Sequence, residues 1–113
     1  MPAKAQPSKA NYTVKAVETV VEGADVKARV FTLAPGDVIP WHSHSETIDH
    51  YFVLCGQLTI ERRTPDDRRT LGVGERYQIR PANIHQVSNG GSADCQFLLI
   101  QGVGRYDWKP AAD

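Results

Sequence analysis

The most informative part of the chain is residues 36–56, which read GDVIPWHSHSETIDHYFVLCG. His42 and His44 form an H-x-H pair within it. If this segment is extended, both imidazoles lie on one face, because side chains alternate along a strand. Two adjacent imidazoles can then bind the same metal ion. For this pair taken alone, the alternative is a surface loop that happens to carry two histidines.

Two carboxylates follow the histidine pair. Asp49 begins a short apolar run, in which alternation places Asp49, Tyr51, Val53 and Cys55 on one face and His50 on the other. Glu46 lies in the preceding loop and reaches the same point only if that loop folds inward. Asp49 is therefore the first candidate for a carboxylate ligand and Glu46 the second, and His50 is left outside the site.

A third histidine lies far along the chain. His85 stands 36 positions after Asp49, behind a turn predicted at Pro81 and Asn83. Neutral imidazole is the commonest metal ligand, so His85 on a separate strand would complete a compact site. The alternative for His85 alone is a hydrogen-bonded histidine in the core.

Size and charge limit the classes of protein to consider. The 113 residues allow one domain rather than two. Thirteen basic and thirteen acidic residues cancel, which argues against a nucleic-acid or anionic-membrane surface and permits self-association. The two cysteines, Cys55 and Cys95, are expected to be reduced, and without an apolar leader segment the expected compartment is the cytoplasm.

Short segments rich in Val, Ile, Thr, Leu and Phe, separated by Gly, Pro, Asn and Asp, predict an all-β domain. Residues 1–11 are predicted to be a disordered or loosely held arm, and residues 12–113 a single β-barrel domain. Gly56 separates two apolar runs and predicts a bulge or tight corner. The tail from about Tyr106 is expected on the outside of the barrel. Strands are predicted near residues 13–21, 25–34, 50–55, 57–63, 68–71, 76–80, 84–89 and 94–103.

The spacing of the first motif resembles that of the cupin superfamily. The family's pattern is G-x5-H-x-H-x3,4-E-x6-G, and Gly36, His42, His44, Asp49 and Gly56 fill it in order. The frame is intact, but the acidic position holds Asp where the family has Glu. Because Asp is shorter by one methylene, the resemblance implies that Asp49→Glu is tolerated or tightens metal binding.

The second cupin motif, G-x5-P-x-G-x2-H-x3-N, is also matched. Gly74, His85 and Asn89 stand at the family's intervals. Pro81 is one place late, and Ala82 replaces the motif's glycine. The two motifs together span residues 36–89, so the resemblance to small, single-domain cupin-2-like proteins covers most of the chain.

The resemblance implies a cupin jelly-roll β-barrel that holds one divalent transition metal. The ligands it implies are His42, His44, Asp49 and His85. A set of nitrogen and oxygen donors suits Fe(II), Mn(II), Ni(II), Co(II), Cu(II) or Zn(II). Tyr51 is a second candidate, which either donates a hydrogen bond to a bound anion or simply packs in the core.

The leading functional expectation is a metal-dependent enzyme that acts on a small organic molecule, with a dioxygenase as the best single choice. Isomerases, decarboxylases and lyases use similar ligand sets, and fold alone does not define function. The alternative is a non-catalytic module that senses or sequesters a small ligand or a metal. A homodimer is expected, because an open barrel leaves edge strands to cover.

Overall fold

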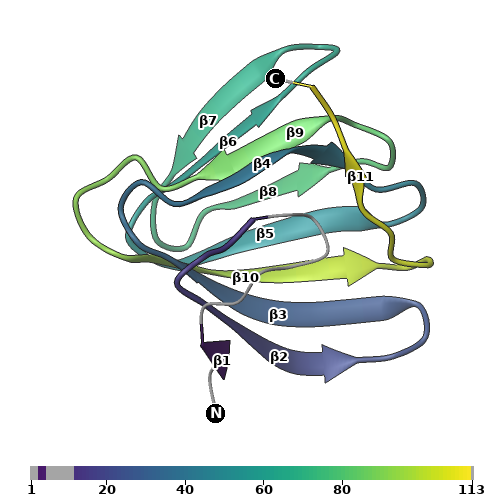
Figure 1. Ribbon diagram of the computed structural model, residues 1–113, viewed down its shortest axis with the longest axis horizontal. Coiled ribbons are helices and arrows are strands. Elements are labelled where there is room, and N and C mark those ends of the chain that lie inside the picture. The colour runs from purple at the N-terminus through teal and green to yellow at the C-terminus, as the bar shows by residue number, and fades with distance from the viewer. Residues whose placement is uncertain (1–2, 5–11, 113) are drawn as a thin grey trace.

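The computed structural model describes residues 3–4 and 12–112 of the chain, the first pair by its backbone alone. Within these residues the structure consists of strands and connecting turns, without a helix (Figure 1). The strands are β1 (Ala3–Lys4), β2 (Ala16–Glu22), β3 (Val26–Leu33), β4 (Val38–Ser43), β5 (Ile48–Cys55), β6 (Leu58–Arg62), β7 (Asp67–Leu71), β8 (Arg76–Ile79), β9 (His85–Ser88), β10 (Cys95–Gly102) and β11 (Lys109–Pro110).

The strands form two antiparallel sheets. One has six strands in the order β1-β2-β3-β10-β5-β8, and the other has five in the order β11-β4-β9-β6-β7. Figure 1 shows β2, β3, β10, β5 and β8 in one layer and β4, β9, β6 and β7 in the other. Consecutive strands such as β4 and β5 lie in different sheets, as in a jelly roll. The predicted all-β jelly-roll barrel is confirmed.

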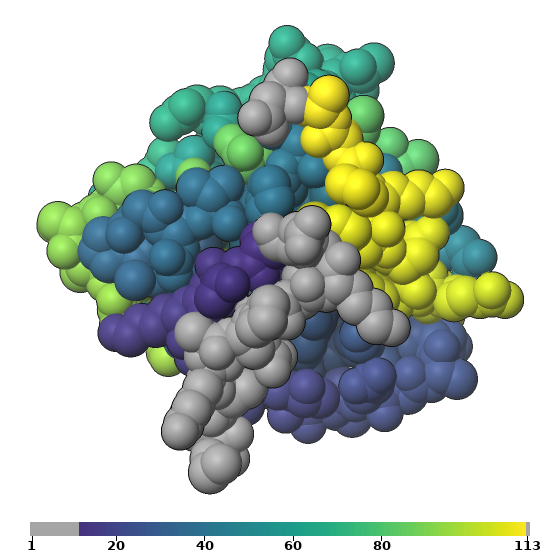
Figure 2. All heavy atoms as spheres, viewed as in Figure 1, coloured from purple at the N-terminus to yellow at the C-terminus, as the bar shows by residue number. Residues whose placement is uncertain are grey.

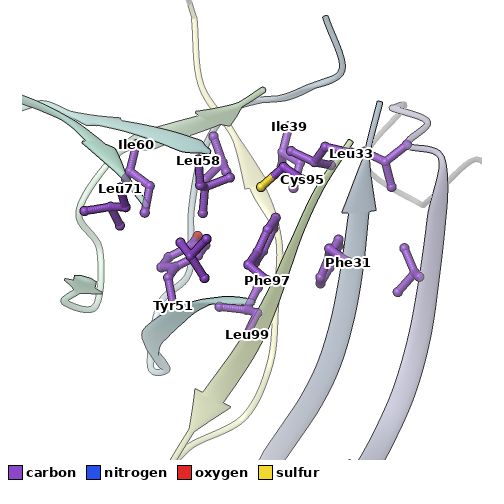
Figure 3. Packing of buried hydrophobic residues seen from close by; sticks show 14 of the residues in the cluster. Phe31, Leu33, Ile39, Tyr51, Leu58, Ile60, Leu71, Cys95, Phe97 and Leu99 are labelled. Carbon is purple, nitrogen blue, oxygen red and sulfur yellow. The ribbon is translucent and has the colours of Figure 1, made fainter. Parts of the chain in front are cut away.

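The hydrophobic core fills the space between the two sheets (Figure 3). Along β10 the inward positions Cys95, Phe97 and Leu99 are buried, as the period-2 pattern predicts. Phe97 stacks on Phe31 with ring centroids 5.2 Å apart, and its ring also lies 5.6 Å from that of Tyr51. These apolar side chains fill one part of the interior, and buried polar side chains occupy another.

Gly56 turns the chain from β5 to β6 at the place predicted for a tight corner. Its φ is +75°, a conformation that residues with a Cβ rarely adopt. A Cβ here would lie 2.4 Å from the carbonyl oxygen of Asp94 and 2.9 Å from the Cα of Cys95. Glycine is therefore required both by the backbone conformation and by the close approach of the neighbouring loop.

Each predicted strand has a counterpart, but three strands of the structure lie outside the predicted ranges. These are β1 in the predicted arm, β4, which includes His42 in a segment left open between strand and loop, and the short strand β11 in the predicted tail. Cys55 was predicted to point inward with Asp49, and this was wrong, because Cys55 is exposed. Cys55 pairs with Gln96 and Val53 with Phe97, so the register shifts at Leu54 and the alternation of side chains breaks there.

The N-terminal arm predicted for residues 1–11 falls mostly outside the described residues. Of its residues the structure describes only the backbone of Ala3 and Lys4, which pairs with Val17 and Ala16 of β2. Both cysteines are free thiols, as expected. In the part of the chain that the structure describes, there is no helix of the length and apolar character needed to cross a membrane.

Candidate metal centre

Four side chains from two motifs converge inside the barrel. His42 on β4 and His85 on β9 are direct partners across two antiparallel strands. His44 follows the end of β4, and Asp49 comes from β5 in the opposite sheet. One ligand atom from each residue lies within 4.8 Å of those of the other three, and all four residues are buried. The structure therefore brings together the four residues that the sequence nominated as ligands.

Each imidazole is held in one orientation by a backbone carbonyl. Nδ1 of His42 lies 2.6 Å from the carbonyl oxygen of Pro40, and Nδ1 of His85 lies 2.9 Å from that of Asn83. Nδ1 of His44 is bonded in the same way to a carbonyl of the C-terminal segment. A carbonyl oxygen can only accept, so each Nδ1 carries the proton. The lone pair of each neutral imidazole is then on Nε2, the atom available to a metal.

Two of these Nε2 atoms face an acceptor. Oδ2 of Asp49 lies 3.1 Å from Nε2 of His85 and 3.5 Å from Nε2 of His44. Neutral imidazoles in this tautomer would direct their lone pairs at the carboxylate, an unfavourable contact in a buried site. A cation between them removes the conflict, and it can be a proton on an imidazole or a metal ion bound to all four groups.

The pKa shifts reflect this competition. Burial lowers the pKa of His42 to about 2, with the neighbouring His85 and His44 acting in the same direction, so His42 stays neutral. Burial also lowers the pKa of His44, but the hydrogen bond to Asp49 and the charge of Asp49 outweigh it, and the net pKa is raised. Burial raises the pKa of Asp49, but hydrogen bonds from His44 and His85 bring it well below its usual value. Asp49 is thus a carboxylate that needs a positive partner.

Two further side chains hold the carboxylate in place. The Tyr51 hydroxyl donates a 2.9 Å hydrogen bond to Oδ2 of Asp49, and burial, followed by the charge of Asp49, raises the pKa of Tyr51 well above its usual value. Gln101 donates through Nε2 to Oδ1 of Asp49 at 3.1 Å. Its other amide atom, Oε1, accepts a 2.6 Å hydrogen bond from Nη2 of Arg29. Arg29, Gln101 and Asp49 form a connected chain of hydrogen bonds.

The donor set fits a transition-metal ion. Metal–nitrogen and metal–oxygen bonds of about 2.0–2.2 Å place neighbouring ligand atoms roughly 3 Å apart in an octahedral site. The separations of 3.1 and 3.5 Å between Asp49 and two imidazole nitrogens agree with such a site. Three neutral imidazoles with one carboxylate balance one of the two positive charges of a divalent ion. The buried cluster of His42, His44, Asp49 and His85 is therefore able to bind a metal ion.

The C-terminal segment closes the site, which corrects the expectation that the tail lies outside. Trp108 stacks on His42 with ring centroids 3.8 Å apart and an interplanar angle of 13°. The backbone carbonyl of Asp107 accepts the Nδ1 hydrogen bond of His44, and the side chain of Asp107 binds the amide and hydroxyl of Ser45. Figure 2 shows the C-terminal residues in yellow, packed onto the body of the domain. The tail therefore forms one wall of the site.

The two alternative site residues lie elsewhere. Glu46 is exposed, and its Oε1 accepts a 3.0 Å hydrogen bond from the backbone amide of Arg105. It therefore does not face the cluster, and the structure favours Asp49 as the carboxylate. His50 lies outside the cluster on the other face of β5, as the parity of that strand predicts. Tyr51 points inward and contacts Asp49, so it belongs to the polar site and not to the apolar core alone.

A small cavity lies beside the cluster. It is lined by His42, His44, Tyr51 and Gln101 together with aromatic side chains and Arg29, and its volume is about 10 Å³. This volume is close to the minimum that one water molecule occupies. An organic molecule does not fit unless a wall residue moves.

Three residues of the site were missed at the sequence level. Gln101 could have been found, because it shares the inward parity of Phe97 and Leu99 on the same strand. Arg29 shares the parity of Phe31 on β3 in the same way. Trp108 could not have been found, since the return of the tail to β4 leaves no periodic signal in eight residues.

The fold and the buried three-histidine, one-carboxylate cluster define a small barrel protein whose interior is able to bind a metal ion. Residues 29–101, more than half of the chain, match the cupin domain family, and the chain belongs to it. The predicted family is thus confirmed. No curated protein sequence matches the chain significantly.

Solved structures share this fold at low sequence identity. An uncharacterised conserved protein with a double-stranded β-helix domain from Klebsiella pneumoniae superposes with a TM-score of 0.76 at 21% identity, covering 96% of this chain and 90% of that one. KdgF from Halomonas sp. gives 0.71 at 18% identity, with 80% and 81% covered. An oxalate oxidase gives 0.70 at 18% identity, and the match covers 77% of this chain but only 46% of the oxidase. At these identities the likeness shows the fold alone.

Proposed function

We propose that this protein is a metal-dependent enzyme that acts on a small organic molecule, and that its reaction is of the dioxygenase type. The observation that carries the proposal is the convergence of three Nε2 atoms and one carboxylate beside a cavity. Sites that are purely structural usually have a closed shell of four ligands, often with thiolates. This site has no thiolate among its four candidate ligands and has space next to them.

A bound redox-active metal would supply a Lewis-acid and electron-transfer centre at the Nε2 atoms. The residues around it would perform the remaining tasks. Tyr51 and Gln101 would hold the carboxylate of Asp49 at a fixed angle, and Trp108 would exclude water from the side of His42. In a dioxygenase reaction both atoms of O2 enter the organic product, so the substrate is the reductant and no other co-reactant is needed.

A non-catalytic module that binds a metal or a small ligand is the second candidate function. The size of the cavity favours it, since about 10 Å³ admits no organic substrate in the conformation described. The two functions differ in whether a wall of the cavity opens. An enzyme requires an opening wide enough for the substrate on the time scale of turnover.

Oxygen consumption separates the two functions. Protein loaded with Fe(II) is mixed with catechols, diketones and thiols, and oxygen uptake is recorded against His85→Ala protein treated identically. Uptake that depends on both the organic molecule and His85 supports the enzyme. Thermal stabilisation by a ligand, without oxygen uptake or any product, would favour the binding module.

We further propose that the protein is a homodimer. Val20 and Val21 on β2 and Leu54 on β5 are among the large apolar side chains that the structure leaves exposed. Apolar side chains of this size near the edge of a sheet are often covered by a partner. Light scattering coupled to size-exclusion chromatography tests this, and a mass of 12.5 kDa at micromolar concentration would contradict it.

A further inference from the structure

Two buried N–H groups beside the metal cavity lack a hydrogen-bond acceptor. Among the described residues, Nε of Arg29 and the indole Nε1 of Trp108 are both inaccessible to solvent and have no partner. Both residues line the cavity next to His42 and His44. A buried donor without an acceptor is costly, and two such donors at one cavity indicate a missing acceptor.

Arg29 brings a positive charge to the site. It lies on β3 with the inward parity of Phe31, and its guanidinium carbon is 5.0 Å from the centre of that ring. One nitrogen, Nη2, donates to Gln101, and the guanidinium also bonds the hydroxyl of Tyr106. Among the described residues no carboxylate forms an ion pair with Arg29. Its positive charge is therefore held beside the metal cluster without a negative partner.

A second, larger pocket shares two of its lining residues with the metal cavity. Its volume is about 250 Å³, and Gln101 and Tyr106 line both this pocket and the metal cavity. Lys27 and Arg105 line the outer pocket, and Nζ of Lys27 lies 4.1 Å above the Tyr106 ring. Positive charge therefore lies on both sides of the wall that Gln101 and Tyr106 form, and a path across this wall would attract anions.

Acidic groups also face this path. Glu22 lines the outer pocket, and the carboxylate of Asp49 lies behind Gln101. The charge of Asp49 is directed at the imidazoles and is neutralised when a divalent ion binds there. Glu22 is opposed by two cations in the same pocket. With a divalent ion bound, the metal, Arg29, Lys27 and Arg105 would bring more positive charge to the path than Glu22, Asp49 and the nearby Glu46 bring negative charge.

We propose that the metal cavity binds a small organic acid as its carboxylate, with Arg29 and Trp108 as the groups that bind it and the outer pocket as its route. This inference rests on the proposed function and specifies its substrate class. Because Tyr106 and Gln101 form the shared wall, the acid reaches the metal when the Tyr106 ring turns aside. A carboxylate has two oxygens that accept charge-assisted hydrogen bonds, so one carboxylate would offer an acceptor to each donor.

The test compares acids with neutral molecules of the same shape. Metal-loaded protein is titrated by calorimetry, in a buffer without carboxylate or phosphate, with acetate, glycolate and malonate and with acetamide, glycolamide and malonamide. We expect at least one acid to bind about tenfold or more tightly than its amide, because a guanidinium forms stronger, charge-assisted hydrogen bonds with a carboxylate than with an amide oxygen. Amides that bind as tightly as the acids would overturn the proposal.

The same titration on variants assigns the binding to Arg29. With the metal added to saturation, Arg29→Gln should weaken binding of the acid by about tenfold or more, and Arg29→Lys should recover part of the loss. Arg76→Gln, an exposed arginine on β8, is the matched control and should bind like the wild type. Full acid binding by metal-saturated Arg29→Gln would contradict the assignment.

This result is separable from the proposed function. If the protein binds acids through Arg29 but consumes no oxygen with any of them, the dioxygenase proposal fails and the ligand class stands. If oxygen is consumed with neutral substrates while acids do not bind, the proposal of a carboxylate ligand is contradicted and the proposal of an enzyme is supported.

Discussion

Gln101 and Asp49 are direct partners across β10 and β5, and Nε2 of Gln101 donates a 3.1 Å hydrogen bond to Oδ1 of Asp49. The side-chain amide of Gln101 is itself held by Arg29, whose Nη2 donates a 2.6 Å hydrogen bond to its Oε1. The carboxylate therefore has its direction set by a neighbour that is itself held in one orientation. Partners of this kind usually affect a metal site nearly as much as the ligands do.

Gln101→Leu should weaken metal binding without removing a ligand. The variant keeps the approximate shape of the side chain but cannot hold Asp49, so we expect affinity to fall about 10–100-fold. Competition with a fluorescent chelator measures this change. Gln96→Leu, on the exposed face of the same strand, is the control and should bind as the wild type. Equal affinity in both variants would show that Asp49 needs no support from Gln101.

The parity of β5 shows how far sequence alone goes. Alternation correctly placed Asp49 and Tyr51 inward and His50 outward, because the pairing of β5 with β10 is regular over these residues. It failed at Cys55, because the register shift at Leu54 adds one residue to the strand. A bulge of this kind depends on the partner strand and has no local signature.

The candidate ligands were accessible to sequence reasoning because their spacing is set by strand geometry. The hydrogen bonds that orient the imidazoles were not, since the acceptors are backbone carbonyls such as that of Asp107, which any residue provides. The stacking of Trp108 on His42 depends on where a short tail returns to the barrel. Such contacts are set by tertiary structure, and periodicity does not report them.

Asp49→Glu should weaken the site, contrary to the expectation from the family motif. The carboxylate of Asp49 already reaches both Nε2 atoms and accepts from Tyr51 and Gln101 at 2.9 and 3.1 Å. Asp49 is 1% exposed, so an added methylene has no free space and costs about 1–3 kcal/mol. Metal content and thermal melting of the metal-free variant measure this. Unchanged stability with tighter binding would support the motif-based expectation instead.

Ala82→Gly should stabilise the protein. Ala82 occupies the position of the motif's glycine and has a φ of +65°, which costs a residue with a Cβ about 1 kcal/mol. Removing that strain should raise the melting temperature by about 4 °C without changing metal content. Ala24→Gly, in the exposed turn between β2 and β3, lacks this strain and should not raise it. A melting temperature that is unchanged or lower in Ala82→Gly would contradict the account of this turn.

Metal-free protein should lose stability as the pH falls below about 6.5. The unfolded chain protonates His42 near pH 6.5, whereas the folded protein does so only near a pKa of about 2, so the unfolded state binds more protons between these values. Within this window, each unit by which the pH falls should lower the free energy of unfolding by up to about 1.4 kcal/mol. His44 has a raised pKa and loses its contribution only above pH 6.5, and the lowered pKa of Asp49 matters only below about pH 4.

Thermal melts in the presence of a chelator, taken between about pH 6.5 and 4.5, isolate the contribution of His42. His42→Phe should show a smaller loss of melting temperature over this range, because phenylalanine stays neutral in both states. His50→Phe changes a histidine outside the cluster and should keep the wild-type slope. The same slope in His42→Phe and the wild type would exclude His42 as the source.

The central claim is that the cluster of His42, His44, Asp49 and His85 holds a metal ion in the folded protein. Elemental analysis of untagged protein, purified without chelators and then supplied with Fe(II), Mn(II), Ni(II) or Zn(II), tests it most directly. We expect about one bound ion per chain in the wild type, and almost none in His42→Ala or His85→Ala proteins that keep the β-sheet circular dichroism spectrum. Wild-type protein without a bound transition metal, or with a metal that His85→Ala retains in full, would contradict the claim.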